Sequence, residues 1–303
     1  MSATPNTSKT LAFTSDASIK PLVVPFFDLG SHTFSYVLQD PASNACAVID
    51  SVMEFDYSAG KISYVGADRI IHYIDEHNLE LEWILETHVH ADHLSAAPYI
   101  QDALGGNLGI GKEVVGVQET FGKIFNEGAE FQRDGSQFDR LFEDGDTFNI
   151  GQLEVNVIHT PGHTPACVSF VVGDSAFVGD TMFMPDAGTA RADFPGGDAR
   201  ELYHSIQRLL LLPDETRVFM CHDYGETREV EYETTIKKER DENIHVNSQV
   251  TEDEYVTLRE TRDAELDVPH LILPSLQVNM RAGHLPPEED NGRVYFKLPI
   301  NLF

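Results

Sequence analysis

The chain has 303 residues, and 41% of them are apolar, which is enough to bury a sizeable core. Its formal net charge is -29, from 21 basic and 50 acidic residues. A surface this acidic repels nucleic acids and anionic membranes, and we exclude both as partners. The acidity itself indicates high solubility, and an anionic substrate would need a local cluster of cations to bind against the overall field.

Three cysteines, an odd and small number, provide no disulfide framework and indicate a reducing compartment. The first twenty residues are rich in Ser and Thr, and they lack both the apolar stretch of a secretory signal and the arginines of a transit peptide. No apolar run approaches the roughly 18 residues that a membrane span needs. We therefore predict a cytoplasmic protein in which residues 1–18 form a flexible N-terminus. A homodimer is compatible with these features.

Runs of β-branched and aromatic residues, separated by turn residues, predict the strands. The expected strands cover residues 19–24, 26–39 with a break at 28–31, 45–52, 81–86, 146–158, 168–178 and 217–220. Helical periodicity and capping residues predict the helices. The expected helices cover residues 66–77, 93–104, most of 111–140, 198–212, 226–242 and 251–266.

Strands with helices interspersed, in two similar halves, predict an α+β protein built as a four-layer α/β/β/α sandwich. We assign residues 19–250 to this domain. We expect residues 251–303 to form a C-terminal extension that packs on the same domain. The sequence contains no internal repeat and no long linker that would mark a second domain.

The densest group of potential metal ligands is the run Thr87-His88-Val89-His90-Ala91-Asp92-His93, which directly follows an apolar strand. Alternate side chains of an extended segment share a side, so His88 and His90 should project together. Asp92 and His93 follow at the turn into a helix. Four potential ligands within six residues, held between a strand and a helix, make a rigid multidentate site. The alternative interpretation is a solvated histidine cluster on a loop, and matching pieces downstream weaken it.

Three further strand ends each deliver a potential ligand. One strand is followed by Thr160-Pro161-Gly162-His163-Thr164, whose Pro-Gly turn aims His163 inward. Another ends at Gly179-Asp180, and a third is followed by Cys221-His222-Asp223-Tyr224. Imidazole and carboxylate ligands suit Zn, Fe or Mn, whereas the lack of paired thiolates argues against a purely structural zinc site.

The order His-x-His-x-Asp-His, Gly-His, Gly-Asp and His resembles the metallo-β-lactamase superfamily over roughly residues 26–222. The resemblance implies a sandwich of the metallo-β-lactamase type. In that superfamily one metal site uses the equivalents of His88, His90 and His163, a second uses those of Asp92, His93 and His222, and the Asp180 position bridges the two. All seven positions are present here, which permits a dinuclear hydrolase.

A closer resemblance is to the persulfide dioxygenases, also called sulfur dioxygenases. It rests on residues 86–93, on Arg191-Ala192-Asp193-Phe194 after Gly188, on His222-Asp223-Tyr224 and on Val278-Asn279-Met280-Arg281. The stretch between Asp180 and Arg191 is longer than in mitochondrial members. In this respect the chain is similar to a bacterial branch that is sometimes labelled β-lactamase-like.

This resemblance implies one Fe(II) per chain, held by His88, His163 and Asp180. Two histidines and one carboxylate on one face of ferrous iron leave positions for a persulfide sulfur and O2 side by side. The implied reaction converts glutathione persulfide, O2 and water to glutathione and sulfite. The remaining residues of the motif set would then hydrogen-bond the ligands and bound water. These residues are His90, Asp92, His93 and His222.

Glutathione persulfide carries two carboxylates and an acidic S–SH group, so it needs local cations in a chain of this charge. Arg191, Tyr224 and Arg240 match positions of the persulfide dioxygenase family, and we expect them to bind the glutathione part. Without the resemblance, Arg240 and its neighbouring lysines would be interpreted as a solvated helix face. Cys167 and Cys221 lie close to the ligands in sequence, and buried packing is the simpler interpretation for both.

Two other functions remain open on the sequence. The first is a dinuclear hydrolase with two Zn ions that cleaves a glutathione thioester and resembles glyoxalase II. The second is a non-catalytic metal-storing or structural protein, which would leave unexplained why so many ligands converge on an open site. Metal content separates the two enzymes, because the dioxygenase requires about one iron per chain and the hydrolase two zincs.

Overall fold

The computed structural model describes residues 16, 18–225 and 228–301, and the predicted flexible segment 1–18 lies almost wholly outside them. Two six-stranded sheets form the centre of the molecule. The first, in spatial order, contains β1 (Leu22–Asp28), β2 (Thr33–Gln39), β3 (Ala45–Ile49), β6 (Glu80–Leu85), β8 (Asn107–Gly111) and β9 (Arg140–Phe142). The second contains β10 (Thr147–Ile150), β11 (Leu153–His159), β12 (Val168–Val172), β13 (Ser175–Phe177), β14 (Arg217–Phe219) and β15 (Glu233–Thr235).

Side chains from both sheets fill the space between them. Phe34 and Leu38 of β2 belong to the same buried apolar cluster as Phe170 of β12 and Phe219 of β14. Val37, which points to the opposite face of β2, instead joins the cluster that packs under the helices. Central strands therefore bury both faces, and this is why they appear in the sequence as nearly continuous apolar runs.

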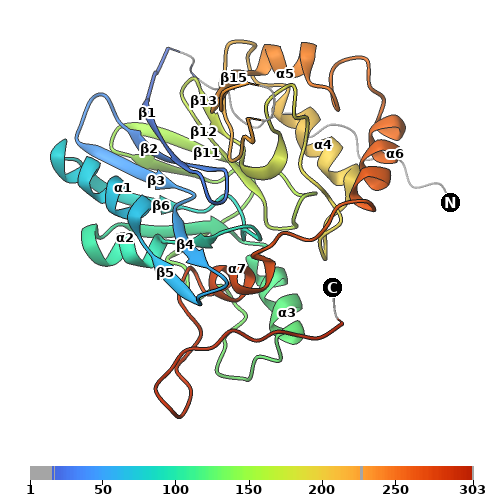
Figure 1. The fold of residues 1–303 in the computed structure, drawn as a ribbon. Coiled ribbons are helices and arrows are strands. Elements are labelled where there is room, and N and C mark those ends of the chain that lie inside the picture. The colour runs from blue at the N-terminus through green and yellow to red at the C-terminus, as the bar shows by residue number, and fades with distance from the viewer. Residues whose placement is uncertain (1–15, 17, 226–227, 302–303) are drawn as a thin grey trace.

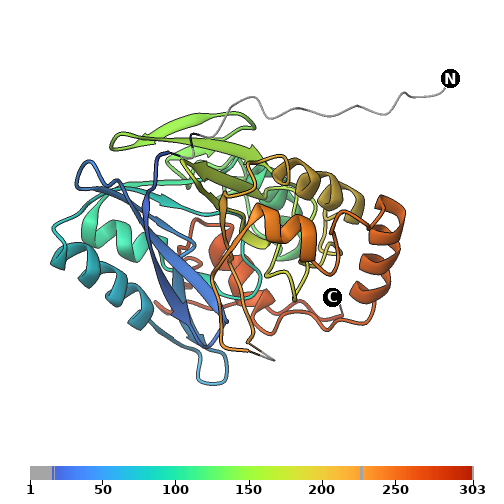
Figure 2. The same cartoon turned by 90° about the horizontal axis from the view of Figure 1, so that it is seen from above.

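Helices cover the outer face of each sheet, as Figure 1 shows, so the layers follow the order α/β/β/α. Figure 2 shows the two sheets from above, with the helices on either side. The first sheet is covered by α1 (Val65–Glu76) and α2 (Ala97–Leu104), with α3 (Val114–Ile124) and α7 (Ile272–Asn279) in the same core. The second is covered by α4 (Ala199–Leu209), α5 (Ile236–Glu242) and α6 (Glu252–Asp263). The predicted fold class is confirmed.

Several predicted helices match well, and their caps explain why. The side chain of Asp198 accepts a hydrogen bond from the backbone of Glu201 at the start of α4. Thr251 and Glu254 form a complete capping box at the start of α6. Of the helices in the described residues, none combines the length and apolar character that a membrane span requires.

The prediction of a mostly helical segment at residues 111–140 is wrong, because only α3 is helical there. Turns follow α3, and Gly135 adopts a φ of 77° that a helix does not allow. The backbone N–H of Gly135 donates to the buried side chain of Gln118 at 2.9 Å, so a side chain replaces a helical partner. The hydrogen bonds of this segment are therefore tertiary, and local periodicity does not reveal them.

The predicted helix at residues 226–242 is largely wrong, since only α5 is helical. Glu226 and Thr227 lie outside the described residues. The segment just before α5 forms β15, in which Thr234 pairs with Val218 of β14. The β-branched threonines and the available strand edge outweigh the helical charge pattern. Thr235 then begins the helix, because its side chain accepts from the backbone N–H of Lys238.

A small three-stranded sheet adjoins residues 87–93, the segment of potential metal ligands that we call the ligand run. It contains β5 (Lys61–Ser63), β4 (Val52–Asp56) and β7 (Leu94–Ser95). The prediction that a helix starts at His93 is therefore wrong, because Leu94 and Ser95 pair with β4 and α2 begins only at Ala97. Helix α7, which the sequence did not predict, packs beside β7. The C-terminal part of the chain thus packs against the strand that directly follows the ligand run.

Candidate metal centre

Loops that follow separate strands bring three predicted ligands together. His88 follows β6, His163 follows β11, and Asp180 lies in the short 3-10 helix η1 (Gly179–Thr181) after β13. Their donor atoms form one buried group. Asp180 Oδ2 lies 3.8 Å from His88 Nε2 and 3.6 Å from His163 Nε2. Atoms that each lie about 2.0–2.2 Å from one ion fall within roughly 4 Å of each other, so this spacing fits a metal ion.

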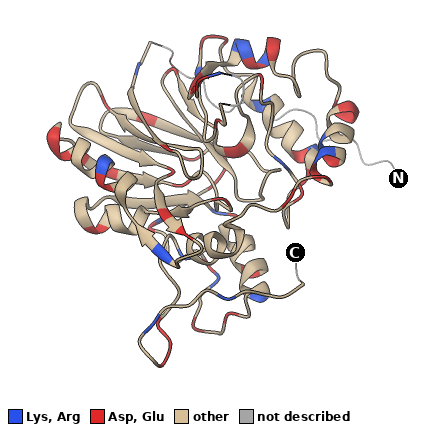
Figure 3. Cartoon of the chain, in the orientation of Figure 1, with Lys and Arg blue, Asp and Glu red and all other residues tan. Residues whose placement is uncertain are grey.

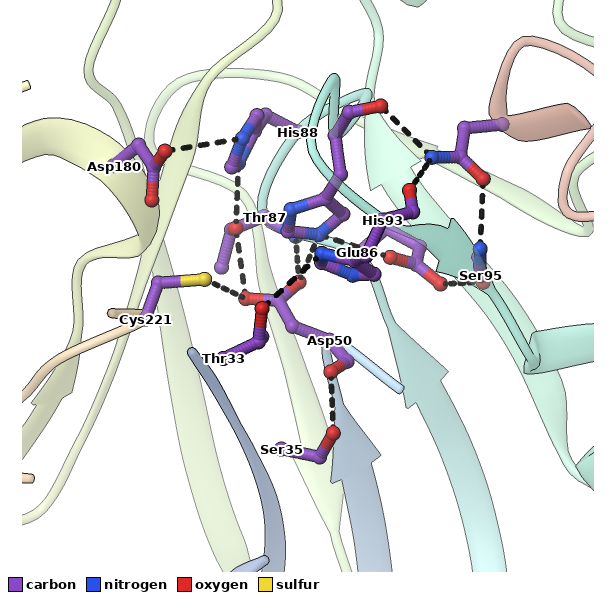
Figure 4. A network of polar contacts seen from close by, with 12 residues as sticks. Thr33, Ser35, Asp50, Glu86, Thr87, His88, His93, Ser95, Asp180 and Cys221 are labelled. Atoms are coloured by element: carbon purple, nitrogen blue, oxygen red, sulfur yellow. Dashed lines mark hydrogen bonds and ion pairs between the residues drawn. The ribbon is translucent and has the colours of Figure 1, made fainter. Parts of the chain in front are cut away.

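A hydrogen-bonded chain from Asp50 fixes the ring of His88, as Figure 4 shows. Thr87 Oγ1 donates to Asp50 Oδ2 at 2.9 Å and accepts from His88 Nδ1 at 3.0 Å. The ring proton therefore sits on Nδ1, and the Nε2 lone pair faces the site. Burial, followed by the charges of His90 and His163, lowers the pKa of His88 well below its ordinary value. The ring is thus neutral, as a metal ligand must be.

Hydrogen bonding and a glycine position the other two ligands. His163 Nδ1 donates to the backbone carbonyl of Arg191 at 2.7 Å, so its Nε2 also faces the site. Gly179 has a φ of +52°, and a Cβ at this position would lie 2.5 Å from Thr87 Oγ1. Only glycine fits such a close approach. The Gly-Asp pair therefore places the Asp180 carboxylate against His88.

His90 is held from its far side by two buried carboxylates. Its Nε2 lies 3.0 Å from Asp50 Oδ1 and 3.3 Å from Glu86 Oε2. Burial acts to lower the pKa of His90, but these two carboxylates raise it well above its ordinary value. The rings of His88 and His90 lie 4.0 Å apart, so the two side chains project together as the extended run predicts.

A second group of donors lies beside the first. His90, Asp92 and His93 present donor atoms close to one another. His222 Nε2 lies 3.3 Å from Asp92 Oδ2 and 3.4 Å from Asp180 Oδ1. Asp92, His93 and His222 are the residues that a second metal ion would need. The geometry therefore accommodates either one ion on the first group or a pair of ions with Asp180 between them.

Buried polar atoms of these loops lack hydrogen-bond partners within the described part of the chain. A buried polar group without a partner is costly, so their convergence on one spot calls for an explanation. A bound metal ion supplies it, because each of these atoms is a good ligand for Fe or Zn. They are His88 Nε2, His90 Nδ1, His93 Nε2, His222 Nε2 and Asp180 Oδ1.

The metal centre opens into a cavity of about 600 Å³. Asp92, His163, Asp180 and His222 form part of its lining, together with aromatic side chains. Figure 3 shows acidic residues spread over most helices of the chain. The cavity differs from that surface, because four arginines line it. Five aspartates line it as well, so the charge that an anionic substrate meets there depends on which arginines are paired with carboxylates.

The structure separates the three predicted substrate-binding residues. Arg191 and Tyr224 line the cavity. Tyr224 stacks parallel to His222 with ring centroids 6.2 Å apart, and burial with the nearby carboxylates raises its pKa, so the phenol keeps its proton. Arg240 is absent from the lining, and its guanidinium contacts Asp214 and the backbone carbonyl of Leu210. The prediction that Arg240 binds substrate is not supported by this geometry, and we do not retain it.

Several residues that support the site are missing from the sequence-based prediction. Asp50 and Glu86 each follow a buried apolar strand, β3 and β6, so the rule that found the ligands also applies to them. Asn279 donates from its side-chain amide to the carbonyls of His90 and His93, at 2.8 Å each. Only the resemblance of residues 278–281 pointed toward it, without indicating this role.

Comparisons with known proteins identify the family. The model of the metallo-beta-lactamase superfamily matches residues 29–222. The chain is 52% identical to a probable metallo-hydrolase of Burkholderia pseudomallei, over 91% of this chain and 98% of that protein. It is 49% identical to the glyoxylase B2 of Dictyostelium discoideum, over 94% of this chain and 98% of that protein.

The persulfide dioxygenases are more distant. The chain is 30% identical to the mitochondrial persulfide dioxygenase ETHE1 of Homo sapiens, over 88% of this chain and 90% of that protein. The crystal structure of ETHE1 from Myxococcus xanthus superposes with a TM-score of 0.70 at 30% identity, covering 87% of this chain and all of that one. By its fold, its ligand set and these matches, the chain belongs to the metallo-β-lactamase superfamily.

Proposed function

We propose that this enzyme is an iron-dependent persulfide dioxygenase that converts glutathione persulfide, O2 and water to glutathione and sulfite. The observation that carries the proposal is the buried group of His88, His163 and Asp180, which faces a cavity lined by arginines. Similarity to persulfide dioxygenases supports it. Two histidines and one carboxylate form the facial set that holds ferrous iron with open positions.

Separate residues of the chain would hold the metal, orient its ligands and bind the substrate. His88, His163 and Asp180 would hold Fe(II), which supplies the electron transfer that O2 chemistry requires. Thr87 and the Arg191 carbonyl keep the two imidazoles in the tautomer that presents Nε2. The Arg191 guanidinium and the protonated phenol of Tyr224 would bind the glutathione part and so orient the persulfide sulfur.

The test is a direct assay on protein reconstituted anaerobically with Fe(II). With glutathione persulfide, we expect O2 to be consumed and sulfite to appear in equal amounts. The same preparation should not hydrolyse a glutathione thioester at a comparable rate. Thioester hydrolysis without O2 consumption would refute the dioxygenase and leave the hydrolase.

The second candidate is a dinuclear hydrolase of a glutathione thioester. Two observations favour it: the second donor group of His90, Asp92 and His93, and the names of the relatives at 52% and 49% identity. Paired zinc ions would generate hydroxide by lowering the pKa of bound water to about 7. Elemental analysis of protein purified without added metal separates the two functions, because the hydrolase requires two zincs per chain and the dioxygenase one iron.

A further inference from the structure

The cavity contains more charged side chains than the metal centre uses. Its arginines are Arg191, Arg228, Arg259 and Arg262, and the last two come from α6. An arginine that is already bound to a carboxylate adds little net charge for a ligand to meet. The free charges in the cavity therefore depend on which of these arginines are paired.

Three of the four arginines are neutralised by carboxylates of the chain. Arg191 binds both oxygens of Asp193, at 2.6 and 2.8 Å. Arg228 binds both Asp223 and Asp186. Arg259 is buried and binds Asp263 through two of its nitrogens, at 2.9 and 2.7 Å. These ion pairs line the cavity and add little net charge to it. The charge that a ligand meets is therefore set by the remaining lining residues.

Among the charged lining residues that the structure describes, two have side chains without a hydrogen-bond or ion-pair partner. They are Arg262, in the last turn of α6, and Asp267, five residues further along the chain. Asp92 and Asp180, by contrast, contact the histidines of the metal centre. The cavity lining thus includes one unpaired cation and one unpaired anion, both exposed and close together in sequence.

This part of the lining is linked to the metal centre through Arg191. The backbone carbonyl of Arg191 accepts from the ligand His163, while its guanidinium donates to the backbone carbonyl of Asp267 at 2.7 Å. Arg191 therefore lies between the metal ligand and this part of the lining. A ligand with its sulfur at the metal and a side arm along Arg191 would bring the end of that arm to Arg262 and Asp267.

His245 supplies a further donor to the cavity lining. It is 8% exposed and lines the cavity. Its Nδ1 accepts from the backbone N–H of Thr189 at 3.0 Å, so in the neutral ring the proton sits on Nε2. Burial, followed by Arg259 and Arg262, lowers the pKa of His245 to about 4, which keeps the ring neutral at physiological pH. Its Nε2–H can thus donate to a carboxylate that Arg262 attracts.

We propose that Arg262 and Asp267 form a subsite for the zwitterionic α-amino acid group of the substrate. Arg262 binds its carboxylate and Asp267 its ammonium. This assignment rests on the proposed function in naming the γ-glutamyl end of glutathione as the group bound. An α-amino acid group needs both charges within one subsite, and Arg262 and Asp267 supply one unpaired charge of each sign to the lining of one cavity.

The test uses S-methylglutathione, which lacks the reactive S–SH group, and two analogues of it. One analogue lacks the α-amino group of the γ-glutamyl residue, and the other lacks its α-carboxylate. Isothermal titration calorimetry at low salt measures the dissociation constants for the metal-loaded wild type and for Arg262→Ala, Arg262→Lys and Asp267→Asn. Arg293→Ala is the matched control, because Arg293 is also exposed and lies outside the cavity lining.

Each variant should lose affinity only for the group that it binds. Arg262→Ala should weaken S-methylglutathione about tenfold but leave the analogue without the carboxylate unchanged. Asp267→Asn should weaken S-methylglutathione by a similar factor but leave the analogue without the amino group unchanged. Arg262→Lys should retain part of the affinity, and Arg293→Ala all of it.

Three results would overturn the subsite: wild-type affinity of both variants for all three ligands, an equal loss of affinity for all three, or the absence of measurable S-methylglutathione binding by the wild type. The outcome is independent of the reaction, because a glutathione thioester carries the same γ-glutamyl group. Failure of O2 consumption with the expected ligand pattern would refute the dioxygenase alone.

Discussion

The side-chain amide of Asn279 donates to the backbone carbonyl of His90 at 2.8 Å, although 189 positions separate the two residues. The same amide nitrogen donates to the carbonyl of His93, and its oxygen accepts from the backbone N–H of Ser95. Asn279 is buried at the end of α7. One side chain from the C-terminal part of the chain thus fixes the backbone of the run that carries the metal-binding histidines.

Asn279→Ala should therefore weaken metal binding without removing a ligand. The variant leaves two buried carbonyls and one buried N–H without partners, at a cost of about 1–3 kcal/mol for each unsatisfied group. We expect metal affinity to fall about ten- to a hundredfold, as for other supports of metal ligands. Titration with Fe(II) and with Zn(II) measures the change. Asn291→Ala, an exposed position in the same C-terminal segment, is the control. Unchanged affinity in Asn279→Ala would contradict this role.

His88→Ala should abolish both iron content and activity. The variant removes one of three ligands and leaves the Nδ1 partner, Thr87 Oγ1, without its donor. Iron is measured by elemental analysis of the reconstituted protein, and activity by O2 consumption. His72→Ala provides the matched control, because its side chain is 79% exposed and lies on α1, away from the site. Full iron content in His88→Ala would show that the ion is held by other residues.

Asp92→Ala and His222→Ala distinguish one metal ion from two. If the enzyme holds a single iron, both variants should keep the iron, and activity should fall about ten- to a hundredfold because the ligands lose their neighbours. If it holds two ions, each variant should lose one of them. Metal content per chain, measured before and after dialysis, decides between the outcomes. Loss of all iron from either variant would contradict the assignment of His88, His163 and Asp180 as the complete ligand set.

The convergence of the predicted ligands could be expected from the sequence because each follows a buried strand, whereas the choice of three of them for one iron came from the family resemblance. A strand end fixes where a side chain can point, so the motif and the preceding apolar run together locate His88 and Asp180 in space. The supports from distant segments could not be predicted in this way. Asn279 lies in a helix that the sequence pattern did not reveal, and its partners are backbone atoms, which carry no sequence signal.

The same limit applies to Arg240. The sequence shows a cation near the site along the chain, but only the packing shows that its guanidinium contacts Asp214 and the Leu210 carbonyl. Arg262 carries no comparable sequence signal, because its helix has mixed charges, a pattern that usually indicates a solvated face. Which arginines are free depends on which carboxylates fold against them, and that is a property of the tertiary structure.

Glu239 provides a prediction about pH and stability. Its side chain is fully buried in α5, and burial raises its pKa to about 8, against an ordinary value of 4.5. Between pH 4.5 and 8 the folded chain holds a proton that the unfolded chain has lost, so this residue makes the fold less stable as the pH rises through that window. Glu239→Gln removes the titratable carboxyl group. It keeps an oxygen that can accept the hydrogen bond from the side-chain amide of Asn243, which in the wild type is 2.7 Å long.

The variant should therefore gain stability over the wild type at pH 8 but not at pH 4.5. The expected difference between the two conditions is roughly 2–4 kcal/mol. Urea unfolding at both pH values measures it, and Glu242→Gln, at an exposed position of the same helix, is the control. An equal effect of Glu239→Gln at the two pH values would show that the carboxyl group is ionised in the folded protein throughout this range.

Arg191 and Arg240 were predicted from the sequence to share one role, and kinetics on the two alanine variants can separate them. Arg191 lines the cavity beside the ligand His163, and its guanidinium lies over the ring of Phe194 at 5.1 Å. Arg191→Ala should lower kcat/KM for glutathione persulfide about tenfold, with iron content unchanged, because a hydrogen bond from the guanidinium to the substrate is lost. A loss confined to KM would mean that Arg191 binds ground state and transition state equally, whereas a fall in kcat would mean that it also orients the persulfide.

Arg240→Ala should keep the kcat/KM of the wild type, since Arg240 lies outside the cavity lining. The variant loses contacts to Asp214 and the Leu210 carbonyl, so any effect should appear in unfolding experiments instead. The kinetics should be measured at low salt, where an exposed charge has its largest influence on an anionic substrate. A tenfold loss of kcat/KM in Arg240→Ala, with wild-type values in Arg191→Ala, would reverse the assignment. The substrate would then have to approach the metal from the α5 side of the molecule.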